Sequence, residues 1–118
     1  MLPSTKRFVL TLCGDADADH ARDPRRYAHV GHLPGKVCLA SAFVRLPEGF
    51  QLGILLHELG HLVLLPRRHA ERDADAAGGA LAGVTVHRRD YRGAPSLEFV
   101  APRDRSRALR AVRRLTNY

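Results

Sequence analysis

The residues most able to do chemistry stand close together near the middle of the chain. His57, Glu58 and His61 form the pattern H-E-x-x-H within an otherwise apolar run. Two histidines four residues apart on a helix lie about 40° apart in projection, so both imidazoles can reach one metal ion. A working zinc site needs a third protein ligand. The chain offers four candidates shortly downstream: His69, Glu71, Asp73 and Asp75.

Glu58 suits a different role in such a site. On a helix it is rotated about 100° from His57, so it flanks the metal instead of binding it. Zinc can lower the pKa of a water to about 7, and a carboxylate at this place can accept the water's proton as the water attacks a carbonyl. A metal-free polar seam between histidine and glutamate is the competing interpretation. We favour zinc, because these side chains are costly to bury in an apolar helix without partners.

The spacing of the downstream residues favours one third ligand. The metzincin pattern requires glycine at position 64 and histidine at position 67, and Leu64 and Arg67 exclude it. Glu71 is favoured because Asp75 follows four residues later, on the same face of a second helix. One carboxylate can then bind zinc while the other accepts the N–H of a ligating histidine. His69 and the aspartates remain the alternatives.

These residues require two helices joined by a short turn. The first is predicted from Pro47-Glu48 to Leu65, since Pro66 follows, and its leucines recur at three- and four-residue steps. Apolar residues on every side near its end predict that it is buried in the middle of the domain. The second is predicted from His69 to Leu81, with Gly83 as its C-terminal stop. The turn between them is long enough for the second helix to fold back to the metal.

Strands and a third helix complete the expected domain. We predict strands over Lys6–Cys13 and Lys36–Leu46, separated by a long connection. A β-hairpin is predicted from "VTVHRRDY" and "SLEFVA". Residues 103–117 are predicted to form a basic helix with Leu109, Val112 and Leu115 towards the core. The expected fold is a single α+β domain over residues 1–118. It has a small twisted, mostly antiparallel sheet packed on the buried H-E-x-x-H helix and on the glutamate-bearing helix.

The composition indicates a basic protein without a membrane span. The net charge is +7, and no run approaches the 18 or more apolar residues of a membrane helix. Lys6-Arg7 precede "FVLTLCG" as in a signal peptide, but the apolar stretch is short and contains Thr11, so we interpret it as a strand. We therefore expect a cytoplasmic protein with no membrane partner. Cys13 and Cys38 are then expected to be reduced, small and buried.

The two helix motifs together resemble a known family. "HELGH" followed by "ERDADAAGGAL" is similar to the gluzincin metallopeptidases, most closely the minimal, ImmA/IrrE-like group. Glu71, Ala74 and Asp75 match the second-helix pattern of that group, whereas Ala77 stands where phenylalanine is usual. The resemblance covers about Leu52–Leu81.

This resemblance implies a function and a set of site residues. It implies a zinc-dependent peptidase acting on a protein or peptide, with Zn²⁺ held by His57, His61 and Glu71 and with Glu58 as general base. It also implies that the strand within Val37–Leu46 lines the cleft and pairs with an extended substrate. Peptide hydrolysis also needs a hydrogen-bond donor that stabilises the negative charge developing on the carbonyl oxygen. Candidates on the hairpin are His87, Arg88 and Tyr91.

Two other functions remain open from the sequence. One is a catalytically silent zinc-binding module that recognises peptides in the same cleft. The other is a basic adaptor that binds nucleic acid or an acidic partner through the C-terminal helix. A solvated helix face explains the arginines of that helix more simply. They are Arg103, Arg105, Arg107, Arg110, Arg113 and Arg114.

Overall fold

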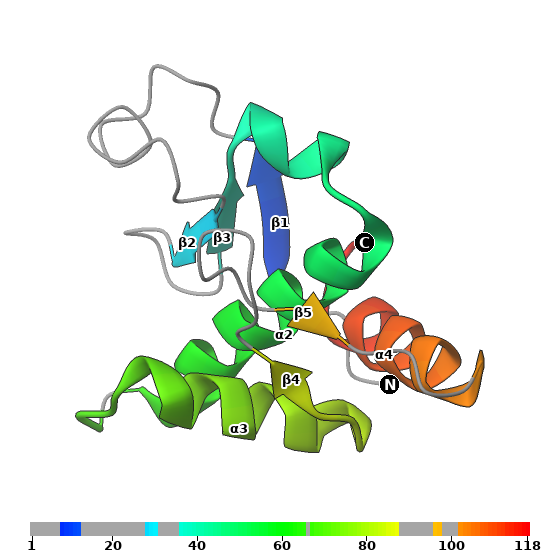
Figure 1. The fold of residues 1–118 in the computed structure, drawn as a ribbon. Coiled ribbons are helices and arrows are strands. Elements are labelled where there is room, and N and C mark those ends of the chain that lie inside the picture. The colour runs from blue at the N-terminus through cyan, green and yellow to red at the C-terminus, as the bar shows by residue number, and fades with distance from the viewer. Residues whose placement is uncertain (1–7, 13–27, 31–35, 66, 88–95, 98–101) are drawn as a thin grey trace, which may run out of the picture.

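The chain has 118 residues, and in this computed structural model residues 8–12, 28–30, 36–65, 67–87, 96–97 and 102–118 are described (Figure 1). The described elements, in chain order, are β1 (Val9–Leu12), β2 (Ala28–Val30), β3 (Lys36–Leu39), the 3-10 helix η1 (Ser41–Arg45), α2 (Glu48–Leu64), α3 (Glu71–Ala82), β4 (Val86–His87), β5 (Ser96–Leu97) and α4 (Pro102–Leu115). Three helices with two small sheets form the predicted α+β fold.

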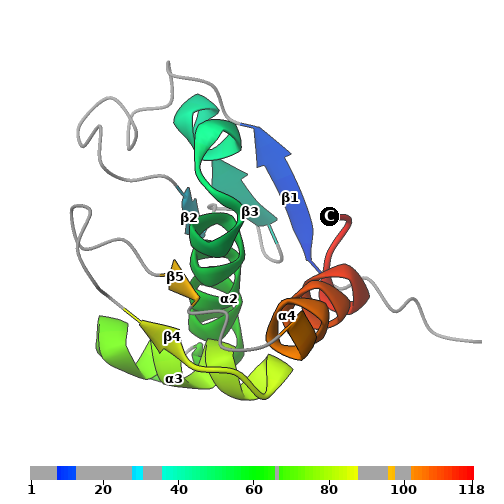
Figure 2. The ribbon, with the colours of Figure 1, turned by 45° about the vertical axis from the view of Figure 1, so that its right-hand side comes forward.

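A three-stranded sheet with the order β1-β3-β2 lies beside α2 (Figures 1 and 2). β2 is antiparallel to β3, with His29 opposite Cys38, whereas β1 is parallel to β3, with Thr11 opposite Cys38. The sheet is therefore mixed, and the prediction of a mostly antiparallel sheet is wrong for the β1–β3 pair. Parallel neighbours need a long crossover, which the connection from Leu12 to Lys36 supplies. β2 lies within that connection, where the sequence predicted no strand.

The strand predicted over Lys36–Leu46 is shorter in the structure. β3 ends at Leu39, and Ser41–Arg45 form η1 instead. Within this turn Phe43 is buried, and Gln51 of α2 donates its side-chain N–H to the carbonyl oxygen of Phe43 at 3.1 Å. The turn is thus held by a contact with the next helix, which a local strand propensity does not reveal. The predicted hairpin is confirmed in its pairing, because β4 and β5 are antiparallel.

The helix α2 is the centre of the molecule, as the sequence predicted. It ends at Leu64, just before the proline, and its residues 52–60 are all buried. Leu52, Leu55, Leu56 and Leu59 have no exposed surface. α3, α4, β2, β4 and β5 all contact α2, so it is covered from several sides (Figure 2). The polar residues of the H-E-x-x-H pattern therefore lie on a helix with little free surface.

α2 and α3 touch through their backbones. A Cβ built on Gly60 of α2 would lie 2.0 Å from the carbonyl oxygen of Ala74 in α3. A Cβ on Gly78 of α3 would likewise lie 1.9 Å from the carbonyl oxygen of Leu56 in α2. Both distances are far below a van der Waals contact, so only glycine fits at these two positions. The absence of a side chain at Gly60 and at Gly78 therefore permits the close contact of the two backbones.

The second helix also ends as predicted. Gly83 follows α3 in the left-handed conformation, with φ of 68°, which glycine adopts without steric cost. The N–H of Val84 then donates to the carbonyl oxygen of Gly79 at 3.0 Å. This closing turn directs the chain back along α3 into β4 (Figure 1).

α4 has a buried face and an arginine-rich exposed face. Leu109 and Val112 are buried and Leu115 packs against the core, as predicted. Beyond the helix, the side-chain oxygen of Asn117 accepts the N–H of Leu10 at 2.7 Å. The residues after α4 therefore cover part of the outer edge of β1. Among the described residues, no helix is both long and apolar enough to cross a bilayer.

Cys38 corrects the expectation of reduced cysteines. It is half-buried in β3 and disulfide-bonded. Cys13 lies outside the described residues. A single pair of cysteines has no diagnostic spacing, because a disulfide depends on how the fold places the two Cβ atoms. Disulfides persist mainly in oxidising compartments, so this bond does not support the expected cytoplasmic location.

Adding one methyl group at the helix contact should destabilise the protein. Gly60→Ala should lower the free energy of unfolding by at least about 2 kcal/mol, because the new Cβ meets rigid backbone instead of a movable side chain. Urea unfolding followed by circular dichroism measures the change. Ala80→Ser is the control, since it adds one heavy atom at an exposed position of α3. A Gly60→Ala loss as small as that of the control would contradict the backbone contact.

Candidate metal centre

His57 and His61 present their rings to the same side of α2. His57 is 7% exposed and His61 is half-buried, and their rings meet edge to face with centroids 4.5 Å apart. The two Nε2 atoms lie 3.1 Å from each other. One turn of helix therefore brings two imidazole nitrogens together, as the spacing predicts.

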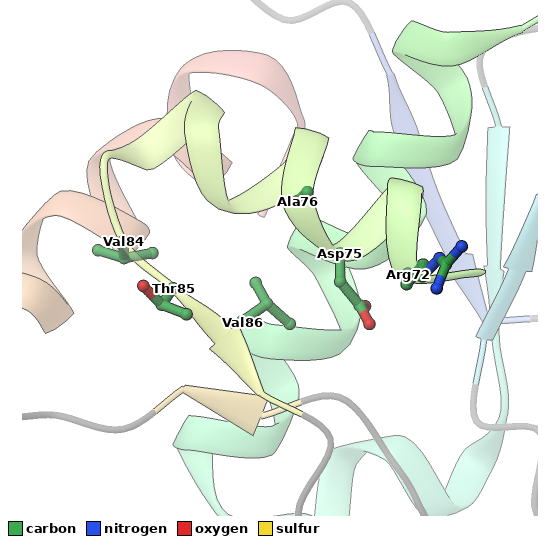
Figure 3. A pocket seen from close by; sticks show the side chains of 6 residues that line it. All are labelled: Arg72, Asp75, Ala76, Val84, Thr85 and Val86. Carbon is green, nitrogen blue, oxygen red and sulfur yellow. The ribbon is translucent and has the colours of Figure 1, made fainter. Parts of the chain in front are cut away.

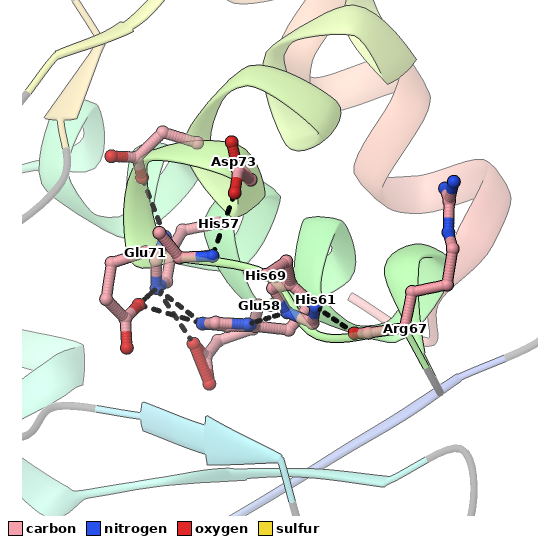
Figure 4. A network of polar contacts seen from close by, with 9 residues as sticks. His57, Glu58, His61, Arg67, His69, Glu71 and Asp73 are labelled. Carbon is pink, nitrogen blue, oxygen red and sulfur yellow. Dashed lines mark hydrogen bonds and ion pairs between the residues drawn. The ribbon is translucent and has the colours of Figure 1, made fainter.

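Glu71 brings a third donor atom to the same point (Figure 4). It is the first residue of α3, and its Oε2 lies 2.7 Å from Nε2 of His57 and 2.9 Å from Nε2 of His61. In the described part of the chain, these three residues form the group that could hold a metal ion. The Glu71 side chain is 65% exposed, so the site opens to solvent on this side.

Asp75 fixes the orientation of His57 from the other side of the ring. Its Oδ1 lies 2.6 Å from Nδ1 of His57, and both residues are buried. A carboxylate accepts hydrogen bonds, so in a neutral ring Nδ1 of His57 would carry the proton, and Nε2, which lies beside His61 and Glu71, would be the atom able to bind a metal. The sequence predicted that Asp75 accepts the N–H of a ligating histidine, and this contact is confirmed.

The other candidates for the third ligand make different contacts. Asp73 accepts the backbone N–H of Ala70 at 2.8 Å and so caps the first turn of α3. Nε2 of His69 lies 2.7 Å from Nδ1 of His61, on the side of that ring opposite the donor cluster. Neither residue joins the group of three donor atoms.

Glu58 lies beside the donor atoms. It is 5% exposed, and its Oε2 is 3.6 Å from Nε2 of His57. It does not belong to the group of three donor residues. A carboxylate at this place can accept a proton from a water held near the donor atoms.

The arrangement of donors and acceptors could accommodate a cation. When Nδ1 of His57 donates its hydrogen bond to Asp75, Nε2 presents a lone pair to the cluster, and the Glu71 carboxylate adds a further acceptor. Burial lowers the pKa of His61 below its ordinary 6.5, although the hydrogen bond with Glu71 raises it in part. A lowered pKa favours the neutral imidazole, which is the form that binds a metal. Acceptors that converge without enough protons between them repel one another unless a positive ion joins them.

The donor types and distances fit a zinc ion. Tetrahedral zinc with bonds of about 2.0–2.1 Å to nitrogen and oxygen separates its ligands by about 3.3 Å. The three atoms lie 2.7–3.1 Å apart, so an outward shift of a few tenths of an ångström would seat the ion. Two imidazoles and one carboxylate leave a fourth position for water or substrate. The structure therefore shows a possible metal site without identifying the ion.

A cavity adjoins the site behind Asp75. Its volume is about 360 Å³, and it lies between α3 and the segment leading into β4 (Figure 3). The lining residues are Arg72, Asp75, Ala76, Val84, Thr85 and Val86. The sequence did not predict this cavity, because the cavity forms only where the turn after α3 brings Val84–Val86 back against that helix. The helical spacing of Arg72, Asp75 and Ala76 on one face was the only signal for it.

The expected substrate-binding strand needs correction. β3 lies between β1 and β2 and is hydrogen-bonded to both, so it has no free edge for an added strand. β2 is at the edge of the described sheet, and it contacts α2, the helix that carries both histidines. The expectation placed on Val37–Leu46 is therefore wrong, since the extra strand β2 was not foreseen. For the oxyanion candidates, Arg88, Tyr91 and the side chain of His87 lie outside the described structure, so they remain predictions.

Comparison with known proteins adds no further information. No protein-family model, curated protein or solved structure matches the chain. The resemblance to gluzincins thus rests on the two helix motifs and on the geometry that they adopt.

Removing the Glu71 carboxylate should abolish tight metal binding. Glu71→Gln should lower the zinc affinity by more than about 100-fold, while Asp75→Asn should lower it by about 10- to 100-fold as an outer partner. Equilibrium competition with a chromophoric chelator measures both variants. Glu48→Gln is the matched control, because it makes the same chemical change on an α2 carboxylate paired with Arg105. Unchanged zinc affinity in Glu71→Gln would show that Glu71 is not a metal ligand.

The titration of His61 gives a second check on the site. In the metal-free protein its pKa should lie below 6.5, because burial disfavours the charged ring. Glu71→Gln should lower this pKa further, since the charge and the hydrogen bond of Glu71 both raise it. Proton–carbon NMR of the imidazole C–H groups across pH 4 to 8 measures both values. A rise of the His61 pKa in Glu71→Gln would show that the two side chains do not meet.

Proposed function

We propose that this chain is a zinc-dependent peptidase in which His57, His61 and Glu71 hold Zn²⁺ and Glu58 is the general base. The observation that carries the proposal is the convergence of Nε2 of both histidines and Oε2 of Glu71 within 2.7–3.1 Å of one another. The carboxylate of Glu58, which is not part of this trio, lies beside it on α2, the helix that carries both histidines.

The division of roles between the two glutamates follows from their surroundings. Glu71 is mostly exposed at the start of α3 and can shift outward to accept an ion. Glu58 is buried on α2 beside His57, where its carboxylate can accept the proton of a water held at the centre. A bound Zn²⁺ supplies Lewis acidity, which makes a nearby water more acidic and polarises a carbonyl.

Each protein group then has one task in hydrolysis. Glu58 takes the proton of the water that attacks the scissile carbonyl and can pass it to the leaving amine. Asp75 holds the ring of His57 in one tautomer, which keeps the Nε2 lone pair directed at the centre. The mostly exposed Glu71 leaves the centre open to a peptide from solvent.

Two regions near the centre could contact a peptide substrate. The edge of β2 can pair with extended backbone, which gives affinity with little dependence on sequence. The cavity lined by Arg72, Thr85 and Val86 offers a cation, a hydroxyl group and apolar surface to a side chain. We propose a protein or peptide substrate on this basis.

The alternative of a basic adaptor gains no specific support. All six arginines of α4 are exposed, as a solvated helix face would be, and Arg105 is already paired with Glu48. Nucleic acid therefore remains a possible but secondary partner, and the catalytically silent zinc module remains the main alternative.

The test of the peptidase proposal is Glu58→Gln. The amide cannot accept the water's proton, so the rate of peptide hydrolysis should fall by at least about 100-fold while zinc content stays at the parent level. Incubation with a mixed peptide library, read by mass spectrometry of new termini, measures turnover. Glu48→Gln again serves as the matched control and should keep full activity.

Two results would decide against the proposal. Activity of Glu58→Gln within a few-fold of the parent would remove Glu58 as the base. A zinc-loaded parent protein that cleaves no peptide in the library, yet binds some of them, would favour the silent recognition module.

A further inference from the structure

His69 makes two short contacts that link the metal centre to the turn before α3 (Figure 4). Its Nε2 lies 2.7 Å from Nδ1 of His61, and its Nδ1 lies 2.7 Å from the backbone carbonyl oxygen of Arg67. The rings of His61 and His69 are tilted by 44° with centroids 4.9 Å apart, so the contact is nitrogen to nitrogen and not a stack. Both ring nitrogens of His69 are therefore engaged.

The contact of His69 with the Arg67 carbonyl oxygen determines which nitrogens of His69 and His61 carry protons. A backbone carbonyl oxygen can only accept, so Nδ1 of His69 carries a proton and donates it to Arg67. In a neutral imidazole the other nitrogen is then an acceptor, so Nε2 of His69 accepts the Nδ1 proton of His61. His61 is thereby left with a lone pair on Nε2, the atom that faces His57 and Glu71.

We propose that His69 is the positioning residue for His61: it selects the tautomer of His61 that can bind a metal through Nε2 and holds that ring in place. This inference rests on the metal site proposed above. It assigns to His69 the same task for His61 that Asp75 performs for His57, but with a neutral acceptor that is itself oriented by the backbone. It also explains why His69 is not a ligand, since neither of its nitrogens is free to reach the ion.

The turn that carries His69 is tied to both helices. Arg67 donates its N–H to the carbonyl oxygen of Leu64, the last residue of α2, at 2.9 Å. Two residues after His69, Glu71 begins α3 and reaches the same centre. One short turn therefore supplies a ligand and the orienting partner of another ligand, so the turn and the site should form together.

The experiment compares His69→Leu with His69→Gln in the full chain. His69→Leu removes the acceptor and should lower the affinity for Zn²⁺ and Co²⁺ by about 10- to 100-fold. In His69→Gln the side-chain oxygen can take the place of Nε2, so the affinity should stay within a few-fold of the parent. Arg68→Gln is the matched control, because Arg68 is an exposed neighbour in the same turn and should have no effect.

Nitrogen-15 NMR of the histidine rings gives a readout that a merely structural role would not move. In the zinc-loaded parent and in His69→Gln, His61 should show an exchange-protected proton on Nδ1. In His69→Leu that proton should exchange rapidly. Equal losses of affinity in both variants, with a disordered turn, would overturn the proposal, as would a His69→Leu protein that keeps parental affinity and a protected Nδ1 proton.

Failure of the metal proposal can be told apart from failure of this one. If the parent bound neither Zn²⁺ nor Co²⁺, the metal site would be wrong, and the tautomer of His61 in the metal-free protein would still decide the role of His69. A proton on Nδ1 in the parent that moves to Nε2 in His69→Leu would support the positioning role. A tautomer that does not depend on residue 69 would overturn it.

Discussion

The close contact between the backbones of α2 and α3 is the constraint on which the site depends. Gly60 stands between the two histidines and meets Ala74, which stands between Glu71 and Asp75. With the helices this close, short side chains one turn apart on α3 can reach opposite sides of the same imidazole. Glu71 reaches Nε2 of His57 and Asp75 reaches its Nδ1. A wider helix separation would leave at least one of these carboxylates out of reach.

The packing around α2 explains why such a polar cluster can exist inside a small domain. Leu52, Leu55, Leu56 and Leu59 bury completely against the sheet and the other helices, and this provides the main stabilisation. Burial of His57 would be costly without partners, but both of its ring nitrogens have them. The core and the site can therefore share one helix, since His57 and His61 both find carboxylate partners on α3.

The sequence predicted the parts of the fold that local signals control. Proline after Leu65 marked the end of α2, Gly83 marked the end of α3, and the spacing from Glu71 to Asp75 identified the carboxylates that meet His57. What it missed depends on contacts between distant segments. Neither β2 nor the disulfide at Cys38 has a local signature. The contact of His69 with His61 was also missed, because it arises from the shape of the turn and not from helical spacing.

The two histidines have partners of different charge, and this difference matters for what the centre can do. A carboxylate such as Asp75 makes the imidazole that it contacts more basic, and a more basic nitrogen binds a metal ion more tightly. The neutral acceptor His69 orients His61 without adding a further negative charge beside Glu58, Glu71 and Asp75. Lewis acidity increases with the positive charge that the ligands leave uncompensated. One charged and one neutral partner would therefore position both rings firmly and, if the centre binds a metal as proposed, would leave that metal more able to polarise a substrate.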